Sequence, residues 1–328
     1  MSLATQPADA PRTLADDVLR QTERQGWHEW RHLSCGLGEL LTRPHASTDF
    51  SGQMRALARR VLHEVRRAPD VAIFEVVHDS ADKLLHYGVV HPLHTAILIA
   101  LVGLRKDWSQ DWTHTGILAA LTANIAVTDL QTALAQQEEP LSAEQRQAIH
   151  NHPVEGARRL KSLGVDDPDW LAAVEQHHEQ TDGKGYPQGL HQVHVLADAI
   201  RTCDVFSAKM SPRASRTVMM SPRAMAEIFR QRSAGYFGAT LVRELGIYPP
   251  GSLVRLGTGE IAMVLCRTRH PQAPDVALLT HPDGTPREHP QRMATSPSGE
   301  HRVVSAVVCQ DLSGLHAPTR LLVHAQDV

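Results

Sequence analysis

The chain has 328 residues, of which 42% are hydrophobic and 21% charged, a composition typical of a soluble protein with one large or two modest domains. Its 33 basic and 36 acidic side chains give a formal net charge of −3, which excludes a strong electrostatic attraction to DNA or to a membrane surface. The four cysteines form no CxxC pair, and the first 15 residues show no signal-peptide pattern. We therefore expect a cytoplasmic protein with reduced thiols.

The amino-terminal part of the chain is predicted to be a leader followed by amphipathic helices. Residues 1–12 are small and polar and contain prolines, which favours disorder. In the region 13–80, apolar residues recur at spacings of three and four over 14–41 and 50–67, as in helices with one buried face. These helices carry no chemical motif, so we expect them to support homodimerisation or to dock a partner.

The helical pattern continues through residues 81–246, where we expect a second helical region. Its most apolar run, 89–104, is too short for a membrane span. Ser142 and Gln145 predict a capping box at a helix start, whereas Pro153 removes a backbone donor and should break or kink its helix. The expected helices are His91–Leu104, His114–Val127, Ser142–Leu163, Pro168–His178, Val195–Lys209 and Ser221–Arg232.

A change of composition after Gly246 marks the last region, residues 247–328. Short runs rich in β-branched residues alternate there with Gly, Pro and Asp, which predicts a small β appendage of about four strands. The expected strands are Leu253–Leu256, Ile261–Cys266, Val276–Thr280 and Val303–Cys309. The predicted fold class is therefore mainly α, with amino-terminal amphipathic helices, a helical bundle and a small carboxy-terminal β appendage.

The most informative stretch spans residues 177–187 and consists of HHEQTDGKGYP. Adjacent histidines on a helix point about 100° apart, so a single metal ion binds both His177 and His178 only where the helix ends. The glycines and the proline that follow predict a rigid, tightly turned loop with an exposed Tyr186. Taken alone, the histidine pair also fits a surface turn with incidental histidines.

The combination of HHE, two further residues and DGxGYP resembles the signature of the HD-GYP family, a branch of the HD metal-dependent phosphohydrolases. The resemblance covers roughly residues 87–256 and implies an HD-type helical bundle that acts on cyclic di-GMP. Further matching motifs surround His152-Pro153 and Asp204. The metal ligands implied by this resemblance are His94, His152, His177, His178 and Asp204.

The resemblance also implies residues for substrate and partner binding. The implied phosphate contacts are Tyr186, Arg213, Arg216 and, as a further candidate, Lys184. Arginine suits this role because its planar fork donates two hydrogen bonds to one phosphate, although without the matching Asp204 the two arginines would fit a solvated basic loop better. The implied contacts with diguanylate cyclase (GGDEF) partners are Gly185, Tyr186 and Pro187.

The chain departs from the family at the motif that names the superfamily. Where family members carry His-Asp-Ile-Gly-Lys, this chain has Ala123, Asn124, Ile125, Ala126 and Val127. An imidazole, a metal-bridging carboxylate and a cation that faces substrate phosphate are thereby lost. Because a neutral amide does not offset the repulsion between two cations, we expect one divalent first-row metal (Fe, Mn or Zn) or none. In the metal-free alternative, the histidines form a hydrogen-bonded polar core with Asp204.

Three functions stay open at this point. The first is a catalytically weak or inactive pseudo-enzyme of cyclic di-GMP signalling, which binds that nucleotide or a related one. The second is a working cyclic di-GMP phosphodiesterase with a reduced metal site. The third is a scaffold that binds neither metal nor nucleotide and associates through its amino-terminal helices.

Overall fold

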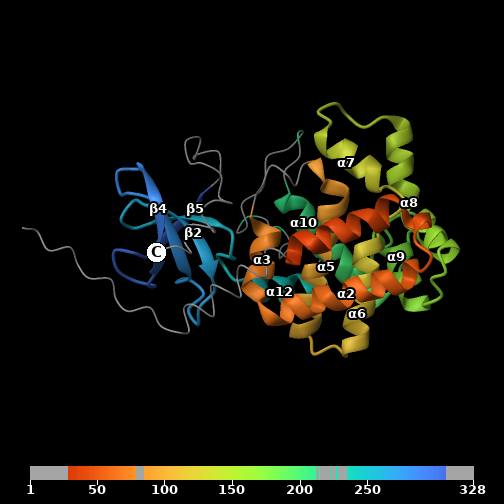
Figure 1. Ribbon diagram of the computed structural model, residues 1–328, viewed down its shortest axis with the longest axis horizontal. Helices are drawn as coiled ribbons and strands as arrows, with labels where there is room; N and C mark the ends of the chain where they lie inside the picture. Colours follow the sequence, from red (N-terminus) through yellow and green to blue (C-terminus); the bar gives the residue numbers. More distant parts are fainter. Residues whose placement is uncertain are drawn as a thin grey trace, which may run out of the picture.

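A computed structural model describes residues 29–78, 85–211 and 235–307, together with residues 214, 223 and 227. It shows a bundle of α-helices with a small antiparallel sheet at one end (Figure 1). This architecture confirms the fold class predicted from the sequence. The predicted leader, residues 1–12, lies outside the described residues.

The helices largely coincide with the predicted ones. A first helix covers residues 29–42 and precedes a short 3-10 turn, η1 (Pro44–Ala46). The others are α2 (Phe50–Arg67), α3 (Pro69–Val77), α5 (Tyr87–Arg105), α6 (Gln110–Thr122), α7 (Thr128–Gln136), α8 (Ala143–Ser162), α9 (Pro168–Gln176), α10 (Val195–Met210) and α12 (Gly235–Leu245).

Helix α5 forms the centre of the bundle and packs against α2, α3, α6, α7, α10 and α12. Among the described residues it is the one helix long and apolar enough to cross a membrane, and 83% of its apolar window is buried inside the bundle, as in the core helix of a globular protein. The hydrophobic core around it extends from Trp30 to Leu245. The amino-terminal helices therefore share their core with the rest of the bundle, and a domain boundary near residue 80 stays a prediction.

Helix α8 tests two local predictions. The capping box is confirmed, because the Ser142 hydroxyl accepts from the Gln145 amide while the Gln145 side chain accepts from the Ser142 amide. A break at Pro153 is wrong, since α8 runs through it to Ser162. The proline leaves the Ile149 carbonyl without its usual helical donor, and Nδ1 of His152 donates to that carbonyl instead, at 2.5 Å.

The sheet has five antiparallel strands in the order β4-β3-β2-β1-β5. They are β1 (Leu253–Leu256), β2 (Ile261–Cys266), β3 (Asp275–Thr280), β4 (Pro286–Ala294) and β5 (Val303–Val307). Strand β4 was not predicted, because two prolines and several charged residues obscure its pattern. Such residues are tolerated at a sheet edge, and within the described residues β4 pairs with β3 alone.

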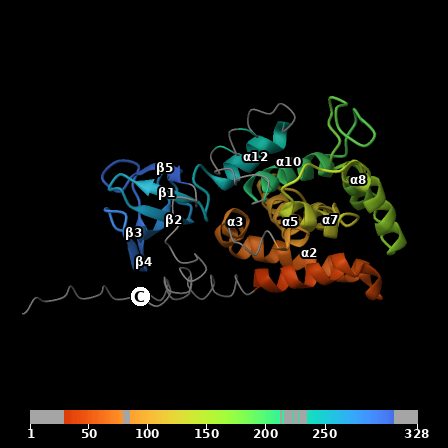
Figure 2. The ribbon, with the colours of Figure 1, turned by 90° about the horizontal axis from the view of Figure 1, so that it is seen from above.

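The sheet is joined to the bundle through α3 and α12, which lie nearest to it in Figure 2. Met263 and Leu279 pack on Phe74 of α3. Arg267, which follows β2, bonds Asp70 of α3 through its backbone amide (3.2 Å) and through Nε (2.5 Å). The same guanidinium reaches the Glu244 carboxylate of α12 at 3.2 Å, so one side chain links both helices to the sheet.

Candidate metal centre

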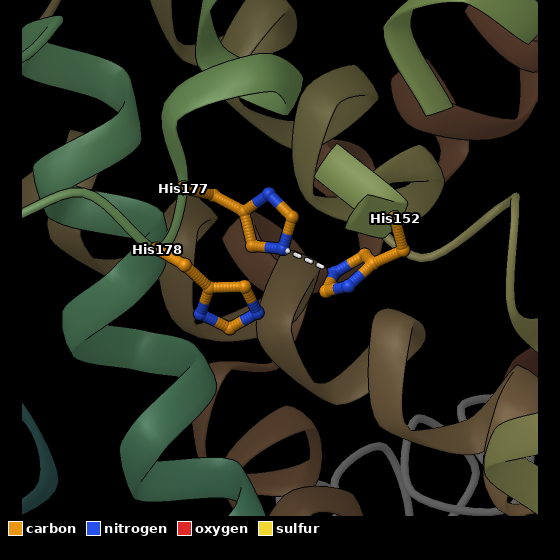
Figure 3. Close-up of side chains that lie close together, drawn as sticks. All are labelled: His152, His177 and His178. Atoms are coloured by element: carbon orange, nitrogen blue, oxygen red, sulfur yellow. Dashed lines mark hydrogen bonds between the residues drawn. The ribbon is translucent and has the colours of Figure 1, made fainter. Parts of the chain in front are cut away.

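Three histidines from two helices converge inside the bundle (Figure 3). His152 lies in the middle of α8, whereas His177 and His178 lie where α9 ends. One ligand nitrogen from each ring can be chosen so that all three lie within 4.8 Å of one another. His152 and His177 are buried, and His178 is half-buried.

Backbone carbonyls determine which nitrogen two of these rings present. Nδ1 of His177 donates to the Val174 carbonyl at 2.6 Å, and Nδ1 of His152 donates to the Ile149 carbonyl. In the neutral rings both Nε2 atoms then carry lone pairs, and they lie 3.1 Å apart. Lone pairs repel at this distance, whereas ligands of one tetrahedral Zn²⁺ with bonds of about 2.05 Å lie about 3.3 Å apart. The arrangement therefore fits one metal ion better than a hydrogen-bonded polar core.

The protonation state of the cluster also suits metal binding. Burial lowers the pKa of His152 to about 3, and the neighbouring His177 adds to this effect. Burial likewise lowers the pKa of His177, and that of His178 falls well below its ordinary value. All three imidazoles are thus neutral at pH 7, which is the form that binds a cation.

Asp204 of α10 is bonded to His91, a buried histidine of α5 that was not among the predicted site residues. Its Oδ1 atom lies 2.7 Å from Nε2 of His91, whose Nδ1 lies 3.1 Å from the Ser207 hydroxyl. Burial alone would raise the pKa of Asp204, but the charge and hydrogen bond of His91, assisted by His178 and His177, hold it well below its ordinary range. The carboxylate is therefore an anion beside the triad.

The predicted ligand His94 has a different environment. It is buried in α5, with Nε2 3.7 Å from a carboxylate oxygen of Glu75 on α3. His91 and His94 are three residues apart and lie on neighbouring parts of one helix surface. The packing of α10 on α5 brings His91, rather than His94, to Asp204, and His94 as a metal ligand stays a prediction.

Tyr186 stacks on two histidine rings rather than standing exposed on its turn. Its ring stacks on His178 with centroids 4.6 Å apart and on His150 with centroids 5.5 Å apart. The residue is half-buried, so the prediction of an exposed aromatic ring on this turn is wrong. Contact of Gly185, Tyr186 and Pro187 with a partner stays a prediction.

The loop after the triad is held by the glutamate of the HHE motif. The buried Glu179 carboxylate accepts the backbone amides of Gln188 (2.7 Å) and Leu190 (2.9 Å). Gly185 packs so closely that a Cβ atom there would lie 2.4 Å from Cα of Glu179. Lys184, a candidate phosphate contact, is 82% exposed and lies 4.0 Å from Asp182. Glu179 and Gly185 of this motif therefore fix the conformation of the loop 179–190.

The turn between α6 and α7 contains the residues that depart from the family motif. Asn124 is buried, and its Oδ1 accepts from Nε2 of Gln131 at 2.9 Å. The turn packs on α8 one helical turn beyond His152, where a Cβ atom at Gly156 would lie 3.6 Å from the Ala123 carbonyl oxygen. Val127 is buried as well. This turn therefore contains an engaged amide and a buried apolar side chain, and its Ala123 carbonyl packs on α8 one turn from His152.

Comparison with known families agrees with this geometry. Residues 75–241 match the family model described as "HD domain". That stretch is just over half of the 328 residues. The chain belongs to the HD domain family. Two curated proteins that are similar in sequence to this chain support the assignment.

The relatives are both cyclic di-GMP phosphodiesterases. The chain is 26% identical to PA4108 of Pseudomonas aeruginosa over 234 residues, covering 70% of this chain and 54% of that protein. It is 20% identical to PdeB of Borreliella burgdorferi over 185 residues, covering 55% of this chain and 48% of that protein. The chain thus spans about half the length of the curated relatives it matches.

A solved structure shares the fold of this HD domain. Bd1817, an HDG"Y"P protein from Bdellovibrio bacteriovorus, superposes with a TM-score of 0.56 at 14% sequence identity. The match covers 68% of this chain and 71% of the Bd1817 chain. It supports the mainly helical HD-type fold that carries the histidine triad.

Two predicted phosphate contacts of the HD domain, Arg213 and Arg216, lie outside the described residues. A cation that the sequence analysis missed is Arg201 of α10, whose charge acts on both His178 and Tyr186. Its position three residues before Asp204 was the available signal, because residues at that spacing share a helix face.

Proposed function

We propose that this HD domain binds cyclic di-GMP, or a related phosphodiester nucleotide, in a pocket with one divalent first-row metal, and that it hydrolyses the ligand slowly or not at all. The observation that carries the proposal is the buried Asn124 amide, engaged by Gln131, at the position where the family motif has a metal-bridging carboxylate. The resemblance supplies the ligand class, and the curated relatives are named for the same nucleotide.

The loss of a bridging anion has a large electrostatic consequence. Two divalent cations about 4 Å apart repel by about 17 kcal/mol at an effective dielectric constant of about 20. A carboxylate between them offsets much of this repulsion, whereas a neutral amide does not. The triad alone suffices for one cation with an open position. We therefore expect single occupancy.

Each residue around the proposed metal has a distinct role. His152, His177 and His178 would hold the ion, which supplies Lewis acidity toward water and a phosphoryl oxygen. The carbonyls of Ile149 and Val174 orient two of these ligands. Asp204, kept ionised by His91, can accept a hydrogen bond beside the triad. Glu179 holds the loop that carries Tyr186.

The test compares the natural chain with a variant whose motif is restored. Metal content and cyclic di-GMP hydrolysis are measured for the wild type and for the triple variant Ala123→His, Asn124→Asp, Val127→Lys, after reconstitution with Mn²⁺ or Fe²⁺. We expect one metal per wild-type chain, and a second metal with hydrolysis at least about 100-fold faster in the variant. Wild-type protein with two metals and turnover near about 10 per second would contradict the proposal.

A working phosphodiesterase with a reduced metal site is the second candidate. It is favoured by the ionised Asp204, which lies beside the triad and could accept a hydrogen bond from a reacting water. This candidate requires wild-type turnover that disappears in both His177→Ala and Asp204→Asn. Activity that survives either substitution would come from a contaminant and would count against it.

The proposal also covers the binding partners of the protein and its location in the cell. We infer a cytoplasmic protein whose Gly185-Tyr186-Pro187 loop contacts diguanylate cyclases and whose amino-terminal helices support homodimerisation. The scaffold alternative predicts binding of neither metal nor nucleotide. Calorimetric titration of metal-loaded protein with cyclic di-GMP separates the two, because saturable binding rejects the scaffold.

A further inference from the structure

Arg201 lies on α10, one turn before Asp204, in the part of the helix that faces the metal centre. Residues three apart on a helix are neighbours on its surface, and α10 packs against both α5 and α9. Figure 3 shows α10, drawn in green, alongside His178. The Arg201 charge acts on His178 and on Tyr186, and it attracts Asp198, Asp204 and Asp182. The shared helix face with Asp204 and the packing of α10 on α9 thus place Arg201 on the side of α10 that carries the buried carboxylate, in agreement with these electrostatic interactions.

Other candidate cations for a phosphate group are less well placed or, like Arg213 and Arg216, lie outside the described residues. Val127 is apolar, and Lys184 is 82% exposed beside Asp182. Arg201 is half-buried, and burial lowers its pKa, so folding removes water from a charge beside the metal centre. An incoming phosphate group would compensate that cost, because a guanidinium donates two parallel hydrogen bonds to its oxygens.

We propose that Arg201 binds a phosphate oxygen of the ligand in the metal pocket and supplies the positive charge that Val127 cannot supply. The inference deepens the proposed function and rests on it for the nucleotide, whereas its own content is an anion site for a phosphoryl group. The competing role is a structural ion pair between Arg201 and the surrounding carboxylates. That role predicts a change in stability without a specific change in phosphate affinity.

The experiment uses the full-length, metal-loaded chain with two probes, inorganic phosphate followed by ³¹P NMR and cyclic di-GMP followed by calorimetry. The variant Arg201→Met removes the charge while keeping an extended side chain. Its matched control is Arg158→Met, which removes an exposed arginine that pairs with Glu155 on α8. We expect Arg201→Met to weaken both affinities by at least about tenfold, the loss typical of a charged hydrogen bond. Arg158→Met should leave both unchanged, and all variants should keep their metal.

A second variant keeps the test decisive if Arg201→Met does not fold. Asp198→Asn removes a carboxylate one turn before Arg201 that competes for its charge. Phosphate binding should then strengthen several-fold, whereas a purely structural pair predicts unchanged or weaker binding together with a lower melting temperature. Unchanged phosphate affinity in Arg201→Met, or no strengthening in Asp198→Asn, overturns the assignment of Arg201.

The two probes separate this inference from the proposed function. Wild-type protein that binds phosphate through Arg201 but does not bind cyclic di-GMP contradicts the proposed nucleotide and supports the anion site. If cyclic di-GMP binds the wild type and Arg201→Met equally well, the proposed nucleotide is supported and the anion site at Arg201 is contradicted. Metal-loaded wild type that binds neither probe overturns both.

Discussion

His152 and His177 reach the metal centre from different helices, yet each is oriented by a carbonyl of its own helix. With Nδ1 committed to Ile149 or Val174, each ring presents Nε2 to the other. His178 is placed differently, by stacking on Tyr186. At this scale the chemistry of the site depends on tautomers as much as on residue identity.

Replacement of a triad histidine tests the centre directly. His177→Ala removes one of three ligands, so we expect its metal affinity to fall by at least about 100-fold. His63→Ala on α2 is the control, because that side chain is 73% exposed. Elemental analysis after dialysis against a weak chelator measures the effect. Equal metal content in both variants would show that the ion binds elsewhere.

The lowered pKa values of the triad also predict how stability depends on pH. An unfolded histidine takes up protons below about pH 6.5, but the folded ring of His152 does so only near pH 3. Stability of metal-free protein should therefore be full above pH 6.5 and fall as the pH is lowered. At pH 5.5 the loss from His152 alone is about 1.4 kcal/mol. Urea unfolding at pH 7.5 and 5.5 measures it, and His152→Gln should reduce the difference.

At the scale of elements, α8 combines a ligand with a proline in consecutive positions. Pro153 cannot donate to the Ile149 carbonyl, and that carbonyl accepts from His152 instead. The proline thus does not end the helix but selects the ring nitrogen that faces His177. Helix α10 has a similar double use, because it supplies Asp204 and Arg201 from neighbouring turns.

The substitution Pro153→Ala separates helix stability from metal binding. It restores a backbone donor that competes with Nδ1 of His152 for the Ile149 carbonyl. We expect unchanged or higher thermal stability of the metal-free protein, together with a metal affinity about tenfold lower. Competition with a chromophoric chelator gives the affinity. An affinity equal to that of the wild type would exclude this role for the proline.

For the whole molecule, the sheet is attached to the bundle at α3 and α12 rather than at the metal centre. Arg267 joins Asp70 and Glu244 at this junction, and Gly251 (φ +88°) lets the preceding turn approach the end of α3. A Cβ atom at Gly251 would lie 2.9 Å from the His78 amide nitrogen. The sheet and the bundle therefore share a polar clamp and a small apolar contact.

Removal of the clamp should loosen the sheet before it affects the metal centre. Arg267→Ala leaves two carboxylates without their shared cation, and we expect a loss of about 2 kcal/mol with faster hydrogen exchange in β2 and α3. The control Arg292→Ala breaks a more exposed pair with Asp275 on the sheet itself. Denaturant unfolding and hydrogen exchange measure both. Equal effects of the two variants would mean that Arg267 is not a specific clamp.

Local patterns in the sequence predicted most of the described helices, although not α7 and α12, together with the capping box and three of the strands within a residue. The predicted helix 221–232 lies mostly outside the described residues. Periodicity and caps depend on neighbouring residues, which is why these elements could be predicted. Tertiary structure decided the rest. The contact of Asp204 with His91 rather than His94 and the stacking of Tyr186 on His178 depend on which helix faces meet. Strand β4 becomes recognisable only beside β3, since its prolines and charges are tolerated at an edge. Contacts between distant segments leave no periodic trace along the chain, and only packing brings them together.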